Sequence, residues 1–330
     1  MPQKQLIPAY NMPAGIDVRC SWDVWVDGSF TYWQAMQDAM EVCITDTSDL
    51  SGTIGADTIT KGNIVNQNFH FKPGFKVAAG LKFDHDDWDA YAEYTWYRGT
   101  DHRSTSFTPL SGLVIPMVGH PDLQIGTLYH SASSSWRLHM DLVDAVMGRW
   151  YYVGTKLTFH PYAGARAAWI RQRWNTAYEA IGGFDIAAGS YTSHQNTNSW
   201  GVGPRMGLDM NWMIGQGFRL YSNAAADILF TRYQKLGYHD TFTNTGSFIL
   251  SQRHLNTVRT HLDMEMGFGW GTYLDCNNWY LDLSAGYGFQ VFFDQNMFSN
   301  YVDDAMTGKR VIPNGNLYIQ GLTATVTLHF

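Results

Sequence analysis

The sequence has few charged residues, few cysteines and no long apolar segment. Asp, Glu, Lys and Arg make up 15% of its 330 residues, against roughly 25% in an average soluble domain. No stretch approaches the roughly 18 consecutive apolar residues of a membrane-spanning helix, which excludes a helical membrane protein. Three cysteines, Cys20, Cys43 and Cys276, are too few and too scattered for a zinc site or a disulfide framework.

Positive charge is scarce as well. The 22 Lys and Arg residues do not cluster along the chain and are outnumbered by 29 Asp and Glu, so no nucleic-acid-binding surface is expected. No cofactor motif and no motif of a hydrolase or metalloprotease is present, so the sequence predicts no cofactor, no metal and no enzyme. Residues 1–20 lack the basic start and apolar core of a secretion signal. Either such a signal has been removed or the protein is not exported.

Aromatic residues are abundant, and many segments alternate between apolar and polar positions. Aromatics reach 15% of the chain, which excludes intrinsic disorder. From Trp279 to Phe293 every second residue is apolar or aromatic without a phase error. This segment is long for a globular strand of about 5–6 residues but suits a tilted membrane strand. An apolar stripe of this length needs either a covering protein layer or a membrane.

Aromatic residues lie at the ends of several such stripes, and smaller apolar residues lie in their middles. This distribution favours a membrane, because amphipathic rings gather at the headgroup level. The predicted lipid-facing girdle consists of Trp88, Trp96, Trp212, Phe218, Trp270, Trp279, Phe293 and Phe330.

Short and long connections alternate along the chain, as in barrels with short periplasmic turns and long extracellular loops. The sequence predicts an all-β fold, a closed antiparallel transmembrane barrel of about ten strands (8–12), with residues 1–21 as a periplasmic tail and 22–330 as one barrel domain. Residues 34–44, which begin within the end of the first strand, are also compatible with a helix. The ten expected strands are 22–36, 68–83, 88–98, 135–147, 156–174, 199–212, 217–232, 255–272, 279–293 and 316–330.

Two blocks resemble a known family. Residues 69–99, FHFKPGFKVAAGLKFDHDDWDAYAEYTWYRG, and 136–173, WRLHMDLVDAVMGRWYYVGTKLTFHPYAGARAAWIRQR, resemble pore-forming outer membrane proteins related to the chlamydial major outer membrane protein. The opening WDVWVDGSFTYWQA and the terminal Phe330 agree with this. The resemblance implies an integral outer-membrane barrel through which small solutes diffuse, and no catalytic residues. This chain has three cysteines where the chlamydial proteins have many, so a disulfide network is not implied.

Ionisable residues on the polar face of the stripes are expected to line the barrel interior. Opposed charges could either form a narrow pore with a transverse field or pair into salt bridges that fill the interior, since about eight strands are already filled by side chains. Asp144 falls on the lipid-facing phase unless a bulge near Leu142 shifts the register. The predicted lining residues are Lys76, Lys82, Glu93, Arg137, Asp141, Arg166, Arg205, Asp209, Arg219, Asp227, Arg259, Asp263, Glu265 and Asp282.

The loop at 99–134 contains an apolar run that needs burial. It either constricts the mouth of the barrel or packs against other loops or a neighbouring subunit. The candidate constriction residues are Leu110, Leu113, Val114, Ile115 and Met117.

Three smaller features have both a functional and a plain interpretation. Asp84–Asp87 with Asp89 resembles a calcium-ligand cluster but also suits a polar turn. The pairs Asp101–His102 and His239–Asp240 lie near the extracellular rim, where a barrel protease would place its groups, but adjacent residues of a strand point to opposite faces. Cys20 and Cys276 both fall on the periplasmic side, where they either form a disulfide or stay free, and Cys43 either stays free or pairs between molecules.

The leading hypothesis from the sequence is a porin for passive diffusion of small hydrophilic solutes and ions. The alternative is a structural or adhesive outer-membrane barrel with a plugged lumen that acts through its surface loops. A third is a soluble β-sandwich that stacks its aromatic rings on carbohydrate. The expected partners are outer-membrane lipids, small solutes and ions, the barrel-assembly machinery through Phe330, and a second copy of the chain in a homo-oligomer.

Overall fold

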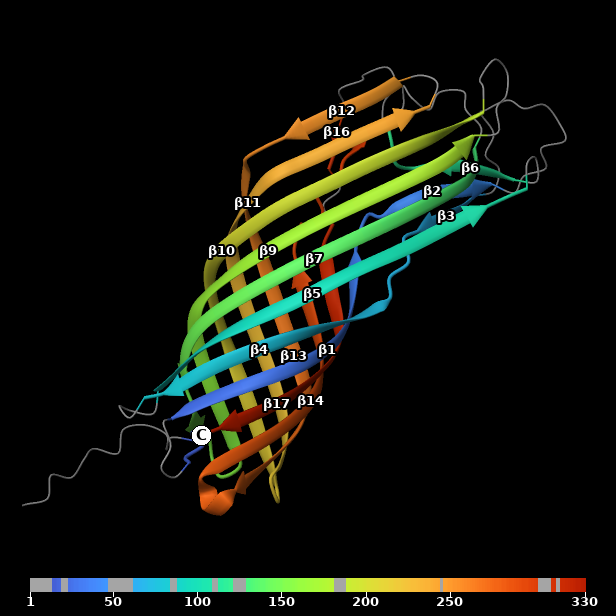
Figure 1. Ribbon diagram of the computed structural model, residues 1–330. Helices are drawn as coiled ribbons and strands as arrows, with labels where there is room; N and C mark the ends of the chain where they lie inside the picture. The colour runs from blue at the N-terminus through green and yellow to red at the C-terminus, as the bar shows by residue number, and fades with distance from the viewer. Residues whose placement is uncertain are drawn as a thin grey trace, which may run out of the picture.

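The protein is a closed, tilted β-barrel (Figure 1). The computed structural model describes residues 14–18, 23–46, 62–83, 88–108, 112–120, 129–180, 188–243, 246–301, 310–312 and 315–330. Ten long strands pair antiparallel around the wall, and the first of them, β1, pairs with both β4 and the last strand, β17. The barrel therefore has no free edge over these strands, as a membrane requires.

The ten wall strands agree closely with the ten expected from the alternation. They are β1 (Val24–Gln37), β4 (Phe71–Lys82), β5 (Trp88–Ser106), β7 (Tyr129–Arg149), β9 (Leu157–Ala180), β10 (Gly189–Gly215), β11 (Phe218–Phe242), β13 (Leu255–Leu274), β14 (Trp279–Phe292) and β17 (Leu317–His329). Their pairings confirm the closed antiparallel barrel. Residues 34–37 complete β1 and 41–44 lie in a further strand, so the helix considered there is not formed.

One side of the barrel is much taller than the other. A tilted membrane strand needs about 9–11 residues, yet β10 has 27 and β11 has 25. These strands continue as hydrogen-bonded sheet into regions expected to be loops, because the sequence prediction ended each strand where its apolar stripe ended. Short strands extend this sheet further: β2 (Glu41–Asp46), β3 (Gly62–Asn66), β6 (Leu113–Pro116) and β12 (Gly246–Gln252). The remaining elements are β8 (Tyr151–Tyr152), the 3-10 turn η2 (Asp275–Asn277), and the hairpin of β15 (Asn300–Tyr301) and β16 (Arg310–Val311).

One connection at the periplasmic end is a tight turn. Strands β10 and β11 are joined by Gln216 and Gly217, both at positive φ (53° and 83°), which is the two-residue turn whose twist matches that of the flanking strands. Among the residues that the structure describes, no helix is long and apolar enough to span a bilayer.

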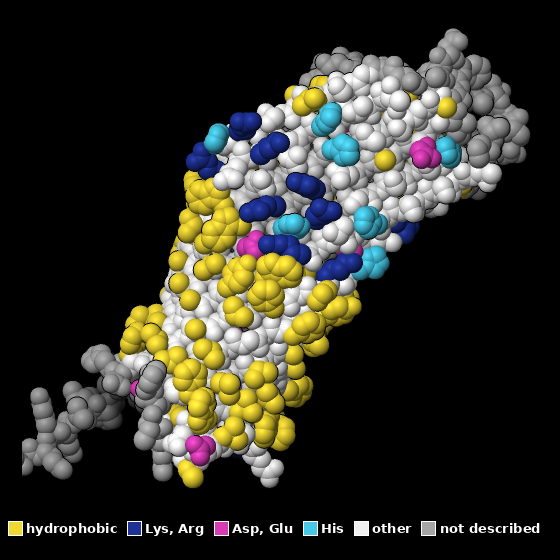
Figure 2. Space-filling view, viewed as in Figure 1, with side chains coloured by type: hydrophobic (Ala, Val, Ile, Leu, Met, Phe, Trp, Pro, Cys, Tyr) yellow, Lys and Arg dark blue, Asp and Glu magenta, His cyan; other side chains and the backbone are white. Residues whose placement is uncertain are grey.

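An apolar band covers the lower part of the outer face that Figure 2 shows. The stripe of β14 lies outside, with Leu283, Tyr287 and Phe289 exposed. The expected girdle residues Trp88, Trp212, Phe218 and Trp279 are exposed on this face, and Trp96, Trp270, Phe293 and Phe330 are half-buried. The band includes Phe30, Val77, Val202, Met206, Phe230, Val258, Met264, Phe268, Leu322 and Val326. This apolar outer surface is what hydrocarbon covers in a membrane barrel.

The two described cysteines have opposite environments, and both are free thiols. Cys43 in β2 is completely buried, and burial raises its pKa to about 11, an effect that the nearby Arg103 partly offsets. Cys276 in the η2 turn is exposed. Cys20, the other half of the disulfide considered above, lies outside the described residues.

This difference predicts selective labelling. With reductant present, a maleimide is expected to modify Cys276 on the order of 100-fold faster than Cys43, because only the thiolate reacts and Cys43 is held neutral. Mass mapping of peptides at increasing labelling times measures both rates, and denaturation should make them equal. Equal rates in the folded protein would show that β2 does not bury Cys43.

Candidate functional site in the barrel interior

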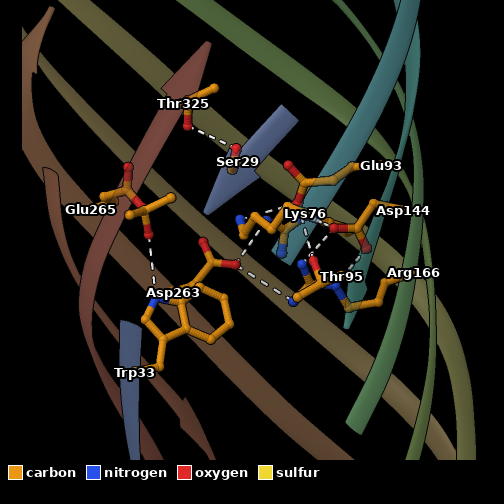
Figure 3. A network of polar contacts seen from close by, with 12 residues as sticks. Ser29, Trp33, Lys76, Glu93, Thr95, Asp144, Arg166, Asp263, Glu265 and Thr325 are labelled. Carbon is orange, nitrogen blue, oxygen red and sulfur yellow. Dashed lines mark hydrogen bonds and ion pairs between the residues drawn. The ribbon is translucent and has the colours of Figure 1, made fainter. Parts of the chain in front are cut away.

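Five charged side chains meet in the middle of the barrel. Arg166 of β9 bridges Asp144 of β7 (Nη2–Oδ2 2.5 Å) and Asp227 of β11 (Nη1–Oδ2 3.0 Å). Arg205 of β10 bridges Asp227 (Nη1–Oδ1 2.8 Å) and Asp263 of β13 (Nη2–Oδ2 2.8 Å). Figure 3 shows Arg166 between Asp144 and Asp263, beside the pair of Lys76 and Glu93. We call these five residues the central ion-pair cluster.

The strand register explains why these residues meet. Asp144 lies directly opposite Arg166 on the neighbouring strand, and Arg205 lies directly opposite Asp227. All point inward because they occupy the same phase of the two-residue repeat. Opposite charges at such cross-strand positions stabilise the sheet. His261 extends the cluster, with Nδ1 2.5 Å from Asp227 Oδ2.

A hollow of about 370 Å³ occupies the periplasmic half of the interior, next to this cluster. Three further sets of ionisable side chains line the hollow. Lys76 contacts Glu93 (Nζ–Oε1 3.2 Å), and Arg219 pairs with Asp282. His160 lies between two carboxylates, Asp89 (Nε2–Oδ1 2.8 Å) and Asp209 (Nδ1–Oδ2 2.9 Å). The described segment Ala14–Val18 also lines the hollow at its periplasmic end.

Most of the residues expected to line the interior do point inward. Twelve of them do so: Lys76, Lys82, Glu93, Arg166, Arg205, Asp209, Arg219, Asp227, Arg259, Asp263, Glu265 and Asp282. The structure adds inward groups that were not among the predicted lining residues. His160 and His261 could have been noticed, because each lies in phase with charged residues of its strand.

Two of the expected lining residues are on the outside. Arg137 is exposed, and Asp141 binds Arg98 on the outer face (Oδ2–Nη2 2.8 Å). Asp144, expected to face lipid, is instead buried inside. The β7–β9 pairing is regular from Ser131 onward, so no bulge near Leu142 shifts the register. The prediction for this strand was wrong because its apolar stripe faces inward.

That stripe belongs to a layer of apolar side chains across the extracellular half of the lumen. Its members come from strands all around the wall and from three connecting segments, and each is at most 4% exposed. We call this layer the apolar septum. It includes Trp33, Met40, Tyr97, Val118, Trp136, Leu138, Met140, Leu142, Ile170, Trp174, Leu229, Phe292, Phe298, Leu317 and Ile319.

The segment 295–299 after β14 folds inward and completes the septum. Its Phe298 ring lies 5.5 Å from that of Trp174 on β9. Gln195 of β10 holds the segment in place, since its amide accepts from Ser299 N (2.7 Å) and donates to Ser299 O (3.0 Å). These contacts come from a connection that was expected to lie outside the barrel, and the sequence analysis did not identify them.

The apolar run of the 99–134 connection packs within the extracellular sheet. Leu113, Val114 and Ile115 belong to β6, which pairs with β2, and the Met117 amide donates to Val42 O (3.2 Å). Val114 packs in a second apolar cluster that also contains Val42, Cys43, Tyr129 and Tyr178. Leu110 lies outside the described residues.

Comparison of the sequence with known families shows to which family the chain belongs. The family described as the Legionella pneumophila major outer membrane protein precursor matches residues 17–330. The chain belongs to this major outer membrane protein family. Its place in the outer membrane follows, and the sequence resemblance to a major outer membrane protein family is confirmed. No curated protein matches the sequence.

Among solved structures, this member of the major outer membrane protein family is similar to outer-membrane barrels of several kinds. The Escherichia coli outer membrane protease OmpT shares 10% identity over 93% of this chain and 96% of its own, with a TM-score of 0.41. The Pseudomonas putida toluene transporter TodX shares 10% identity over 93% and 90%, with a TM-score of 0.31. Ail, the attachment invasion locus protein of Yersinia pestis, shares 6% identity over 92% of this chain and 99% of its own, with a TM-score of 0.24. Likenesses this distant carry no argument about function.

The Asp–His pairs of this major outer membrane protein point to opposite faces, as strand geometry predicts. Asp101 is buried and contacts His70 (Oδ1–Nδ1 3.0 Å), whereas His102 is exposed. Asp240 is buried with Tyr191 and Tyr238, whereas His239 is exposed. Neither pair converges on one side. The Asp84–Asp87 cluster lies outside the described residues.

Proposed function

We propose that this outer-membrane barrel is a narrow, gated pore for passive diffusion of small hydrophilic solutes and ions, closed in the conformation described. The observation that carries the proposal is the hollow of about 370 Å³ lined by charged groups within the membrane part of the barrel. Ionisable side chains at membrane depth are costly and typically line a water-filled path. If the interior residues served only to stabilise the barrel, apolar side chains would stabilise it as well as ion pairs do, because replacing buried ion pairs by apolar residues is often neutral or stabilising.

The apolar septum acts as the gate in this proposal. Hydrophobic constrictions in channels stop conduction by excluding water. Three members of the septum, Met40, Val118 and Phe298, belong to connecting segments and not to the ten wall strands. Movement of the segment at 295–299 would therefore open space without breaking the barrel wall.

Charges on opposite sides of the interior would orient a solute that enters the hollow. Arg219 pairs with Asp282 on one side of the barrel and Lys76 with Glu93 on the other. A lumen of this kind sorts solutes by charge and dipole. The proposal includes no catalysis, cofactor or nucleic acid. We still expect two further interactions: assembly into a homo-oligomer, and recognition of Phe330 by the barrel-assembly machinery.

A second candidate is a structural or adhesive barrel that acts through its extracellular part. The observation that favours it is the deep burial of the septum, together with the pairing of the interior charges. In this case the ion pairs only stabilise the interior, and permeability has no role.

Conductance of the refolded protein in a planar bilayer separates the two candidates. A gated pore is expected to give discrete current steps with long closed periods, and their reversal potential in a salt gradient gives the ion selectivity. A membrane that stays silent at high protein load and across the voltage range would contradict the pore and support the structural barrel.

A further inference from the structure

A group of basic side chains lies on the outer face of the tall side, just above the apolar band. Figure 2 shows Lys, Arg and His side chains gathered there, between the band and the extracellular end. They come from four separate strands, β5, β7, β9 and β11, each of which contributes only one or two of them, so the chain shows no long basic run. We call this group the basic patch: Arg98, Arg137, His139, Arg171, Arg173, Arg232 and Lys235.

The strand register assembles the patch in rows that run across neighbouring strands. In the upper row Arg137 lies directly opposite Arg173. In the next row His139 lies between Arg98 and Arg171, and the row continues through Asn198 to Lys235. Residues of successive rows are about 7 Å apart along each strand.

The lowest row of the patch contains aromatic residues beside Arg232. Trp169 and Trp200 are direct neighbours in this row, and Arg232 follows Trp200. Below them comes the apolar band, in a row that contains Val143, Val202 and Phe230. Tryptophan gathers at the membrane–water interface, so this row marks the headgroup level. The basic patch therefore begins at that level with Arg232, and its next row lies about 7 Å beyond it, on the extracellular side.

Three arginines of the patch lack protein counter-charges. The one acidic side chain among these rows, Asp141, is bound by Arg98 through both oxygens (2.8 Å each). Within the part of the chain that the structure describes, Arg137, Arg171 and Arg173 make no ion pair and are exposed. Like charges directly opposite each other on neighbouring strands destabilise a sheet. An external anion would relieve the repulsion between the neighbours Arg137 and Arg173.

We propose that the basic patch binds the phosphorylated headgroup of an anionic lipid in the outer leaflet. Its position against the apolar band fits a ligand whose acyl chains lie in the membrane and whose phosphates lie just above it. Arginine suits this ligand, because its planar guanidinium binds phosphate oxygens in pairs. Asn196 and Asn198 of β10 lie directly opposite Arg173 and Arg171 of β9. Their side-chain amides can bind sugar hydroxyls. The proposal does not depend on the pore, because it concerns the outer face alone.

Binding of lipid A tests the proposal. The full-length barrel in neutral detergent is titrated with fluorescent lipid A carrying two phosphates, and with its dephosphorylated form. The wild type is expected to prefer the phosphorylated form. The double variant Arg137→Gln/Arg173→Gln is expected to bind it about 30-fold more weakly, because each basic residue near a membrane surface contributes about 5-fold.

Two controls accompany this variant. Arg137→Lys/Arg173→Lys keeps the charge and should retain most of the affinity. Lys156→Gln removes an exposed charge at the periplasmic end and should have no effect. Heat-dependent gel mobility shows that each variant is folded. Equal affinity of the wild type for both lipids, or an unchanged affinity in the Gln variant, would overturn the proposal. Loss of heparin binding without loss of lipid A binding would also overturn it and assign the patch to a polyanionic glycan.

Discussion

The double variant Trp174→Ser/Phe298→Ser is expected to convert rare openings into sustained conductance. The two rings lie 5.5 Å apart in the apolar septum, one on the wall strand β9 and one on the inserted segment. Both are nearly inaccessible to solvent. Their removal frees room for several water molecules, each of which takes about 30 Å³ in the liquid, and the hydroxyls supply hydrogen-bond partners for them. A wetted septum no longer excludes ions.

The matched control carries the same residue changes on the outer face. Trp200→Ser/Phe230→Ser alters one tryptophan and one phenylalanine that point away from the lumen. Its open probability in the planar bilayer should equal that of the wild type. If the septum variant is folded and as silent as the control, the septum is not a gate, and the structural barrel is the better description.

The variant Asp227→Ala is expected to lower the free energy of unfolding by about 3–5 kcal/mol. Asp227 is fully buried and accepts from both Arg166 and Arg205. Its loss removes the carboxylate that joins the two arginines and leaves one aspartate for each, Asp144 for Arg166 and Asp263 for Arg205. Removing one partner from a buried ion-pair network is strongly destabilising, because the remaining buried donors lose their acceptor. Urea unfolding in lipid vesicles, followed by tryptophan fluorescence, measures the change.

An exposed acidic residue provides the comparison for this measurement. Glu179 contacts His130 at 3.5 Å, but its side chain is 68% exposed. Glu179→Ala is expected to change the free energy of unfolding by less than about 1 kcal/mol. If Asp227→Ala also changed the free energy of unfolding by less than about 1 kcal/mol, water would have to reach the central ion-pair cluster and screen its charges.

The wall of the barrel could be predicted from the sequence because membrane strands have two chemically different faces. In β13 and β14 an apolar outer face alternates with a polar inner face, and the observed pairing of Met264 with Phe289 and of Met266 with Tyr287 follows the predicted phases. The hydrocarbon outside dictates that pattern. Ten strands of the right order and approximate bounds result from it.

The same reasoning was wrong for β7, where the physical environment changes along the strand. Within the membrane part Asp144 faces inward, and above it Trp136 and Leu138 face inward while Arg137 faces water. Alternation shows that two faces differ, but it does not show which face is inside once the strand leaves the bilayer. An apolar stripe above the membrane therefore belongs to the interior.

Two features depend on register and tertiary packing and could not be predicted from alternation. The segment at 295–299 fills the lumen through contacts with residues about 100 positions earlier, such as Gln195. The basic patch forms because Arg137 and Arg173 meet across two strands. Neither leaves a local signal in the sequence.

The unequal strand heights have a consequence for proteolysis. On the tall side, β9, β10 and β11 carry hydrogen-bonded sheet far beyond the length needed to cross the membrane. Proteases cut chain that can adapt to their active sites, which favours exposed loop tips over paired strands. A protease that acts from outside the cell would meet paired β-strands on this side. Cleavage should therefore be confined to the connections at the extracellular end of these strands, and the membrane-embedded part of the barrel should stay intact.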